Sequence, residues 1–350
     1  MHRVSIVGAG IGAAHAQGYM ANADRFEISS ICDLDKARAM PLAEKCGAAY
    51  VADIADVLSD PNVDIVDVCL PPHLHFQTCM DALDAGKIVV CEKPLVSSLK
   101  EADMLETKAA ETGRPIFPVF QYRYGLGASQ LHALIDAGLA GTCYTGTLET
   151  HWDRDADYYA VDWRGTWAGE QGGAILGHAI HIHDLLSCFL GPVARIYAET
   201  ATRVNQIEVE DCAALTIRME SGAVVTSSVT LGCAGNLSRL RLMFEGFTVE
   251  SDHSPYAPAE AEWTFTARAP TEQADVDRVL AGVKDSESGF AGLFSAMADA
   301  LEGSGGREVT LKDGRRSLEF VTGVYASSRS GASVAFPLEE THPLYAGWVP

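Results

Sequence analysis

The first 120 residues alternate short apolar runs with longer amphipathic stretches, which is typical of a parallel sheet covered by helices on both faces. Strands are predicted at 4–7, 26–32, 65–70, 88–91 and 116–120. Helices are predicted at 13–21, 35–46, 75–85 and 98–112. Ser98 and Glu101 have capping-box spacing, and Gly86 marks a helix end. This part of the chain should be a doubly wound α/β fold.

Beyond residue 121 the apolar positions recur every second residue, which favours an antiparallel sheet with one face on a core. Strands are predicted at 143–151, 193–202, 211–218, 223–231 and 239–250. Helices are predicted at 128–137, 172–189, 289–302 and 314–329, whereas 252–288 should be loops. We therefore expect two domains, an α/β domain over 1–121 and an α+β domain over 122–350.

Composition narrows the class of protein. The net charge of −21 and a pI near 4.8 disfavour nucleic acid and anionic membrane as partners, and no apolar run is long enough for a membrane span. The chain starts directly with a strand pattern instead of a secretory signal, so we expect a cytoplasmic protein. Nine cysteines without a CxxC pair should be reduced.

A glycine-rich turn joins the first predicted strand to the first helix. Gly8, Gly10 and Gly12, with Ile11 between the last two, leave backbone amides free to cradle a pyrophosphate at the helix N-terminus. Alone this GxGxxA pattern is weak, because a tight turn without a ligand also uses glycines. Its place between a strand and a helix favours a dinucleotide site.

Asp33 ends the second strand, 25 residues after Gly8. A carboxylate there can accept hydrogen bonds from the adenosine ribose and repels a 2′-phosphate, which favours NAD over NADP. Lys36 and Arg38 follow closely in the sequence, and their positive charges work against a strict preference for NAD.

Two further segments follow the carboxyl ends of strands, where ligands bind in such sheets. The segment Leu70-Pro71-Pro72-His73 lies at the end of the predicted strand 65–70, and Glu92-Lys93-Pro94 comes after the apolar run IVVC. The proline holds Lys93 extended, so its ammonium should point into a cleft. An ordinary exposed lysine at a strand end is the alternative.

Taken together, the motifs resemble the Gfo/Idh/MocA family of oxidoreductases over essentially the whole chain. The resemblance rests on the glycine turn leading to His15, Asp33, LPPHLH (70–75), AGKIVVCEKPL (85–95), GGAILGHAIHIHDLL (172–186), VEDCAAL (209–215) and VYASSRSG (324–331). EKP after an apolar strand, combined with GG, His and Asp on a later helix, is a specific combination.

The resemblance implies a nicotinamide-binding domain followed by a domain with an open, mostly antiparallel sheet that often forms a homodimer or homotetramer. It implies oxidation or reduction of a secondary alcohol of a sugar or cyclitol. Lys93 is then the lysine that contacts both cofactor and reacting hydroxyl, and His181 is the acid or base. The expected cofactor-binding residues are Gly8, Gly10, Ile11, Gly12, Asp33, Leu70, Pro71, His75, Glu92, Lys93 and Gln121.

The chain departs from the family pattern at two places. Gly177 stands four residues before His181, where the family has an aspartate, so His178 could take over part of the role. The glycines also lie one residue closer to His15 than usual, which leaves their individual roles open.

A metal site is the alternative for the histidine-rich helix. His178, His181, His183 and Asp184 carry ligand-type side chains, but positions 181 and 183 point about 200° apart on a helix. We expect no metal there, and we expect His183 and Asp184 to serve packing and hydrogen bonding.

The substrate should be bound by residues that flank these motifs. The expected set is Lys93, Arg123, Tyr158, Trp163, Arg164, His178 and His181. Aromatic faces suit the C–H patches of sugars, and charged groups suit hydroxyls. Arg123 and Arg164 could instead indicate an anionic sugar, and any of the aromatic residues could belong to a core or a subunit interface.

Three functions compete. The first is an NAD-dependent dehydrogenase or reductase of a sugar, cyclitol or sugar derivative. The second is redox-assisted glycoside cleavage, in which transient oxidation allows elimination of the aglycone and the hydride is returned. The third is a non-catalytic dinucleotide-binding sensor, which would need neither Lys93 nor His181.

Overall fold

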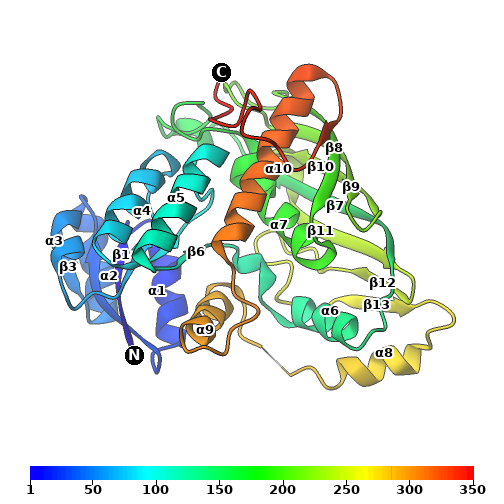
Figure 1. Cartoon of the computed structure of the whole chain (residues 1–350), viewed down its shortest axis with the longest axis horizontal. Helices are drawn as coiled ribbons and strands as arrows, with labels where there is room; N and C mark the ends of the chain where they lie inside the picture. The colour runs from blue at the N-terminus through cyan, green and yellow to red at the C-terminus, as the bar shows by residue number, and fades with distance from the viewer. Residues whose placement is uncertain (285) are drawn as a thin grey trace. The chain divides into compact units, whose positions relative to one another are not determined.

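The computed structural model describes residues 1–284 and 286–350, which divide into two compact units (Figure 1). Unit 1 comprises Met1–Phe120 and Phe290–Arg315, and unit 2 comprises Gln121–Gly289 and Arg316–Pro350. The first break between the units therefore lies one residue before the predicted boundary at 121/122, and residues 290–315 group with unit 1. Residue 285, within the predicted loop 252–288, lies outside the described residues.

Unit 1 is built on a parallel sheet with the strand order β3-β2-β1-β4-β5-β6. The strands are β1 (His2–Val7), β2 (Phe26–Cys32), β3 (Ala49–Val51), β4 (Ile65–Val68), β5 (Ile88–Cys91) and β6 (Ile116–Pro118). The predicted doubly wound sheet is confirmed. The three-residue β3 was missed, because so short a strand carries little periodic signal.

The helices of unit 1 begin and end where local signals indicate. They are α1 (Gly12–Ala21), α2 (Lys36–Cys46), α3 (Ile54–Ser59), α4 (His75–Asp84), α5 (Leu99–Thr112) and α9 (Gly289–Leu301), with a 3-10 turn η1 (Pro72–Leu74) before α4. Ser98 Oγ accepts a hydrogen bond from Glu101 N at 3.2 Å, as the capping spacing predicts. Gly86, just past α4, has a φ of 73°. The six-residue α3 was not predicted.

The returning helix α9 covers α1 within unit 1 (Figure 1). The ring of Phe294 stacks on that of Tyr19 at 3.7 Å, and a Cβ at Gly18 would lie 2.8 Å from Phe290. Arg25 forms ion pairs with Glu302 and Asp299 at 2.8 Å each. These contacts explain why the chain returns, and they join residues too distant in sequence for local periodicity to reveal.

Unit 2 contains a larger sheet with the order β13-β12-β11-β7-β10-β9-β8-β14, in which only β7 and β10 pair in parallel. Its strands are β7 (Cys143–Asp153), β8 (Val193–Ala201), β9 (Cys212–Met219), β10 (Val224–Thr230), β11 (Gly232–Phe244), β12 (Phe247–Glu250), β13 (Thr264–Ala267) and β14 (Val334–Ala335). The predicted strand 239–250 is thus two strands joined by a tight turn.

Unit 2 also contains several helices. They are α6 (Leu126–Asp136), α7 (Ile180–Leu190), α8 (Gln273–Leu280) and α10 (Leu311–Ser330), with short turns η2 (Gln121–Arg123) and η3 (Tyr158–Ala160). The predicted loop 252–288 was wrong where β13 and α8 form. The predicted helix 172–189 starts with a π-helical turn, η4 (Ile175–Ala179), before α7.

Alternation along the strands sets which face is buried. On β9, Leu215 and Ile217 are buried, whereas Thr216 and Arg218 are exposed. On the buried face, Ser327 Oγ of α10 accepts a hydrogen bond from Ala198 N at 2.9 Å. The predicted two-faced, mostly antiparallel sheet is confirmed.

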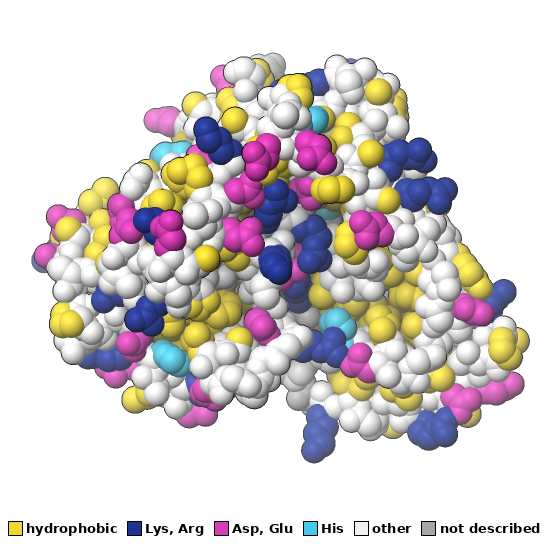
Figure 2. Space-filling view, viewed as in Figure 1, with side chains coloured by type: hydrophobic (Ala, Val, Ile, Leu, Met, Phe, Trp, Pro, Cys, Tyr) yellow, Lys and Arg dark blue, Asp and Glu magenta, His cyan; other side chains and the backbone are white. Residues whose placement is uncertain are grey.

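Charged side chains of both signs are interspersed on the face shown in Figure 2. The net charge of the whole chain is −21. Within the described residues, no helix combines the length and the apolar character that crossing a membrane requires.

Candidate functional site

The glycine turn of unit 1 has a distinct role for each glycine. Gly8 has a φ of 107°, and a Cβ there would lie 2.3 Å from the carbonyl oxygen of Cys69. A Cβ at Gly12 would lie 2.7 Å from Ile6 Cγ2, so this glycine allows α1 to pack closely on β1. A Cβ at Gly10 would meet no heavy atom of the described residues within 4 Å. Although these glycines lie one residue closer to His15 than usual, they still allow a tight turn and close packing of α1 on β1.

Helix α1 begins at Gly12 after Ile11, and no side chain of the described residues caps it. Ala13 N and Ala14 N donate to Gly10 O and Ile11 O, and the positive end of the helix dipole remains a suitable place for a phosphate. The open space at Gly10 gives such a ligand access to the backbone. The turn therefore fits a dinucleotide pyrophosphate.

Asp33 is held beside this turn by two backbone amides. Its Oδ2 accepts from Ala9 N at 2.7 Å, and its Oδ1 accepts from Asp35 N at 2.8 Å. Each oxygen keeps a further lone pair for a ribose hydroxyl. Arg38 lies 3.9 Å from Asp33 Oδ2 and 3.5 Å from Asp35, so a cation stands close enough to favour a 2′-phosphate if the carboxylate were removed.

We expect NAD to bind at least about tenfold more tightly than NADP. The contact between the Asp33 carboxylate and the 2′-phosphate costs on the order of 1 kcal/mol in water and more where water is excluded. Asp33→Ser should bring the two affinities together, with Arg38 left to meet the phosphate. Isothermal titration calorimetry with both cofactors measures the ratio. Asp35→Ser is the matched control, since serine still caps α2. Equal shifts in both variants, or tighter NADP binding by the unmodified protein, would contradict the assignment.

The loops after β4 and β5 are tied together by His75. Its Nδ1 lies 2.7 Å from the carbonyl oxygen of Pro94, and its Nε2 lies 2.8 Å from that of Leu70. The ring is fully buried, and burial lowers its pKa. The structure thus places His75 as a brace between the two loops, with both ring nitrogens facing protein atoms. Leu70 and Pro71 are half-buried at the end of the loop after β4.

Lys93 follows β5 directly. Its backbone nitrogen donates to Glu92 Oε2 at 2.9 Å, and the backbone nitrogen of Glu92 donates to Val68 O at 3.0 Å. The Lys93 side chain is half-buried, whereas Glu92 is buried. The main chain that carries the Lys93 ammonium is therefore anchored at the carboxyl end of the sheet.

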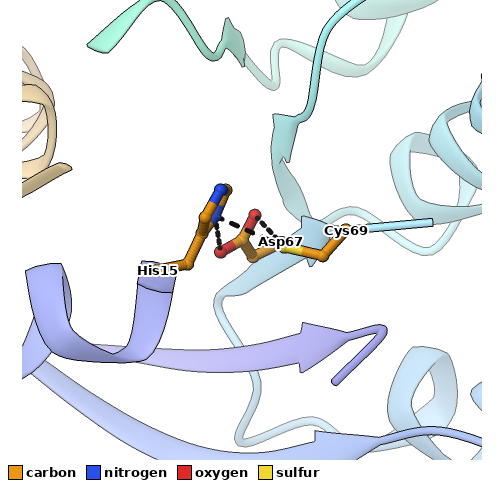
Figure 3. Close-up of side chains that lie close together, drawn as sticks. All are labelled: His15, Asp67 and Cys69. Carbon is orange, nitrogen blue, oxygen red and sulfur yellow. Dashed lines mark hydrogen bonds and ion pairs between the residues drawn. The ribbon is translucent and has the colours of Figure 1, made fainter. Parts of the chain in front are cut away.

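A buried charged cluster lies beneath these loops. His15, in the first turn of α1, reaches Asp67 on β4 and Cys69 just after it (Figure 3). His15 Nδ1 lies 2.8 Å from Asp67 Oδ2, His15 Nε2 lies 3.0 Å from Glu92 Oε1, and Cys69 Sγ lies 3.3 Å from His15 Nδ1. Burial has the largest single effect and lowers the pKa of His15, but Asp67 and Cys69 together raise this pKa well above its usual range.

Among the described residues, His15, Asp67 and Cys69 form the only group whose ligand-type atoms all lie within 4.8 Å of one another. Their separations are hydrogen-bond lengths, and each group serves as a partner of another. Asp67 was predicted only as part of an apolar strand. A carboxylate inside a buried strand is the signal that points to such a partner.

In unit 2, the histidines of the predicted motif separate onto different partners. His178 Nε2 lies 3.3 Å from the Tyr158 hydroxyl, and its ring meets the Trp152 ring edge-on at 5.2 Å. The His181 ring stacks on Tyr122 with centroids 4.4 Å apart. Both imidazoles are buried. His178 and His181 therefore belong to different contact sets, although they are three residues apart.

Gly177 lies within the π-helical turn η4. A Cβ there would meet no heavy atom of the described residues within 4 Å. Local crowding therefore does not explain the glycine that replaces the family aspartate. We have no physical account of this substitution.

Asp184 and His183 serve the interior of unit 2. Arg123 Nε and Nη2 donate to the two carboxylate oxygens of Asp184 at 2.7 and 2.6 Å, and both side chains are buried. His183 Nε2 lies 2.9 Å from Ser227 Oγ, and burial lowers the His183 pKa to about 3. The expected packing role agrees with this geometry. Arg123, which is expected to bind substrate, directs its Nε and Nη2 to this carboxylate.

Tyr158 is the centre of an aromatic and cationic cluster. The guanidinium carbons of Arg164 and Arg154 lie 4.0 and 5.0 Å from the centre of its ring. Arg154 also lies 4.9 Å from the Trp152 ring, and its Nη2 donates to the Tyr256 hydroxyl at 3.2 Å. We call Trp152, Arg154, Tyr158, Arg164, His178 and Tyr256 the tyrosine cluster. Tyr256 was missed, because the sequence around it resembles a loop.

Trp163 and Gln121 are the remaining predicted site residues of unit 2. Trp163 is half-buried, with Arg164 Cζ 4.8 Å from its ring. Gln121 Oε1 is buried without a hydrogen-bond partner in the described part of the chain, so a bound ligand could satisfy it.

Glu210 holds the start of the histidine-bearing segment. Its carboxylate accepts from Gly173 N at 3.1 Å, from Ile175 N at 3.0 Å and from the Tyr325 hydroxyl at 3.1 Å. Burial raises its pKa to about 7. The motif VEDCAAL contains this residue, but the pattern alone assigned it no contact.

The Glu210 shift predicts how stability depends on pH. A folded-state pKa near 7 against 4.5 in a free side chain means that the folded protein holds an extra proton between these values. The resulting stabilisation is present below pH 4.5 and is lost as the pH rises through 7, by at most about 3 kcal/mol. Glu210→Gln, which does not titrate, should flatten this part of the profile.

Urea unfolding at several pH values measures the effect. Glu208→Gln, at an exposed carboxylate two residues earlier, is the control and should leave the slope unchanged. The same slope in Glu210→Gln and in the unmodified protein would contradict the expected shift.

Comparison with known proteins agrees with this architecture. The family described as "Oxidoreductase family, NAD-binding Rossmann fold" matches residues 2–120, and the "GFO/IDH/MocA C-terminal domain" matches residues 128–250. The uncharacterized oxidoreductase YrbE of Bacillus subtilis is 28% identical over 226 residues, which is 63% of this chain and 64% of that protein. D-glucoside 3-dehydrogenase of Escherichia coli is 31% identical over 195 residues, 54% of each chain. Thus the match spans less than two thirds of either relative.

A solved structure is similar over nearly the full length. The WlbA dehydrogenase of Bordetella pertussis, in complex with NADH and UDP-GlcNAcA, is 29% identical with a TM-score of 0.84. The similarity covers 96% of this chain and 99% of that one.

Proposed function

Since the chain belongs to the Gfo/Idh/MocA family of NAD-binding oxidoreductases, we propose that it transfers a hydride between NAD and a secondary alcohol of a sugar, cyclitol or sugar derivative. The observation that carries this proposal is the dinucleotide cradle of unit 1, in which Ala9 N holds Asp33 beside the Gly8 turn. D-glucoside 3-dehydrogenase and the WlbA dehydrogenase, both similar to this chain, support the substrate class.

Nicotinamide, when bound, accepts or returns the hydride. The chain itself has to move the hydroxyl proton and stabilise charge on the oxygen. In our proposal His181 accepts the proton, with its ring held by stacking on Tyr122. Lys93, from a backbone anchored by Glu92, donates a hydrogen bond to the reacting hydroxyl.

The tyrosine cluster favours a sugar that carries a negative charge. Arg164 is partly neutralised by Glu170 at 3.6 Å. Arg154 has no carboxylate within 4.0 Å in the described structure, and its Nη1 and Nη2 donate to a backbone carbonyl and a tyrosine hydroxyl. A guanidinium among aromatic rings suits a carboxylate or phosphate beside a sugar ring. We therefore propose Arg154, in place of Arg123, as the group that meets an anionic substituent.

The test is a screen of neutral sugars, inositols, uronates, glycosides and nucleotide-linked sugars with NAD. Accumulation of NADH supports the dehydrogenase, and a preference for anionic compounds supports the assignment of Arg154. Release of an aglycone with catalytic NAD and no net NADH would replace the proposal by redox-assisted glycoside cleavage. NAD binding without turnover of any class would favour the sensor.

A further inference from the structure

A chain of buried polar contacts runs from α1 to the backbone of Lys93. His15 Nε2 lies 3.0 Å from Glu92 Oε1, and the other oxygen of the same carboxylate accepts from Lys93 N at 2.9 Å. The His15 side chain is fully buried, and that of Glu92 is 8% exposed. Water therefore cannot readily replace either contact. His15 thus controls a carboxylate that directly holds Lys93.

The proton positions in this chain follow from the chemistry of the groups. An ionised carboxylate only accepts hydrogen bonds, so the His15 nitrogens that face Asp67 and Glu92 both have to donate. His15 is then an imidazolium between two carboxylates. The raised pKa of His15 agrees with this state. A charge-assisted contact on Glu92 is stronger and more directional than a neutral one.

The backbone around Lys93 is anchored on both sides. Before it, Glu92 N is bound by Val68 O of β4, and Lys93 N is bound by the Glu92 side chain. After it, the carbonyl oxygen of Pro94 is bound by His75. The contact through Glu92 depends on a side chain, and His15 binds the second oxygen of that side chain.

We propose that His15 is a positioning residue for Lys93: it holds one oxygen of Glu92, so that the other oxygen fixes the main chain from which the Lys93 side chain extends. This inference rests on the proposed function, in which Lys93 acts on the reacting hydroxyl. Displacing a catalytic group by about 1 Å can cost on the order of 10²-fold in rate. Loss of the contact between His15 and Glu92 should therefore lower kcat.

A purely structural role is the competing explanation, because His15 also neutralises Asp67 and packs against Phe290 at 4.5 Å. The two explanations differ in which ring nitrogen matters. Positioning of Lys93 requires donation from Nε2, whereas neutralising Asp67 requires donation from Nδ1. Two neutral variants separate these roles, since a glutamine amide can reach the place of Nε2 and an asparagine amide can reach that of Nδ1.

The experiment compares steady-state kinetics of His15→Gln and His15→Asn, with the substrate found in the screen. We expect His15→Asn to lose about 10²-fold in kcat, while the KM for NAD changes by less than about threefold. His15→Gln should recover most of the lost kcat. Equal losses in the two variants, or the better rate in His15→Asn, would overturn the proposal.

Asn22→Ala is the matched control for damage to α1. Asn22 Nδ2 donates to Gly18 O and Ala291 O at 3.0 Å each, so its removal costs buried hydrogen bonds in unit 1 without touching Glu92. It should lower the melting temperature and keep kcat. A comparable loss of kcat in Asn22→Ala would mean that any disturbance of α1 has this effect, which overturns a specific role for His15.

If neither His15 variant folds, nitrogen-15 NMR of the unmodified, histidine-labelled protein gives the decisive measurement. A proton on His15 Nε2 at neutral pH supports donation to Glu92, and a bare Nε2 overturns it. Failure of the proposed function is distinguished by Lys93→Met. Full activity of Lys93→Met would contradict the proposed function, in which Lys93 is catalytic. An inactive Lys93→Met together with a fully active His15→Asn would overturn only the inference about His15.

Discussion

Lys93→Met is expected to abolish turnover while the protein folds and binds NAD within about tenfold of the unmodified affinity. Methionine keeps the length and the apolar stem of the side chain but removes the ammonium. The backbone nitrogen at position 93 can still donate to Glu92 Oε2, so the loop after β5 keeps its anchor. The charge that develops on the substrate oxygen then has no cationic partner, and a loss of at least about 10² to 10⁴ in kcat follows.

Stopped-flow and steady-state measurements of NADH formation give kcat, and calorimetry gives the affinity for NAD. Lys100→Met, at an exposed position on α5, is the control and should behave as the unmodified protein. Retention of most of kcat in Lys93→Met would make this lysine structural and would place the catalytic site elsewhere.

His181→Asn is expected to lower kcat/KM by about 10² to 10⁴, because a general base is removed from the reaction. The affinity for NAD should remain unchanged. Asparagine is close in size to imidazole, so the space against Tyr122 stays largely filled. The pH profile of kcat/KM should lose the limb on which the base becomes protonated.

His178→Asn is the matched comparison, because His178 is also buried but contacts Tyr158 and Trp152 instead of Tyr122. His178→Asn should weaken substrate binding but keep the limb of the kcat/KM profile on which the base becomes protonated. If the limb survives in His181→Asn and is lost in His178→Asn, His178 is the base. If it survives in both, Tyr158 becomes the next candidate for the base.

The fold of unit 1 could be predicted from the sequence because the features that set its helix and strand ends are local. Apolar runs, the Ser98 cap and the glycine at position 86 each act within a few residues, and all three coincide with observed element ends. The same holds for the strands of unit 2, whose alternation sets the buried face. Short elements such as β3 and α3 were missed because so few residues carry no clear period.

The sequence predicts residues of the candidate site only where they lie together in one contiguous motif. The glycine turn and the Glu92-Lys93-Pro94 segment could be assigned from sequence, since each positions its own backbone. The partner of Arg123 could not be assigned, because Asp184 is 61 residues away and only packing within unit 2 brings them together. The position of Arg123 after a strand predicts a substrate contact, but nothing near it in the sequence indicates the ion pair with Asp184.

The family, the two sheets and the identity of the motif residues could therefore be assigned from the sequence alone. The return of residues 290–315 to α1, and the contacts of His15 with both Asp67 and Glu92, are visible only in the folded chain. The difference lies in the range of the interactions. Propensity, capping and periodicity act between neighbours, whereas buried ion pairs and aromatic stacking act between side chains that only the folded chain brings into contact.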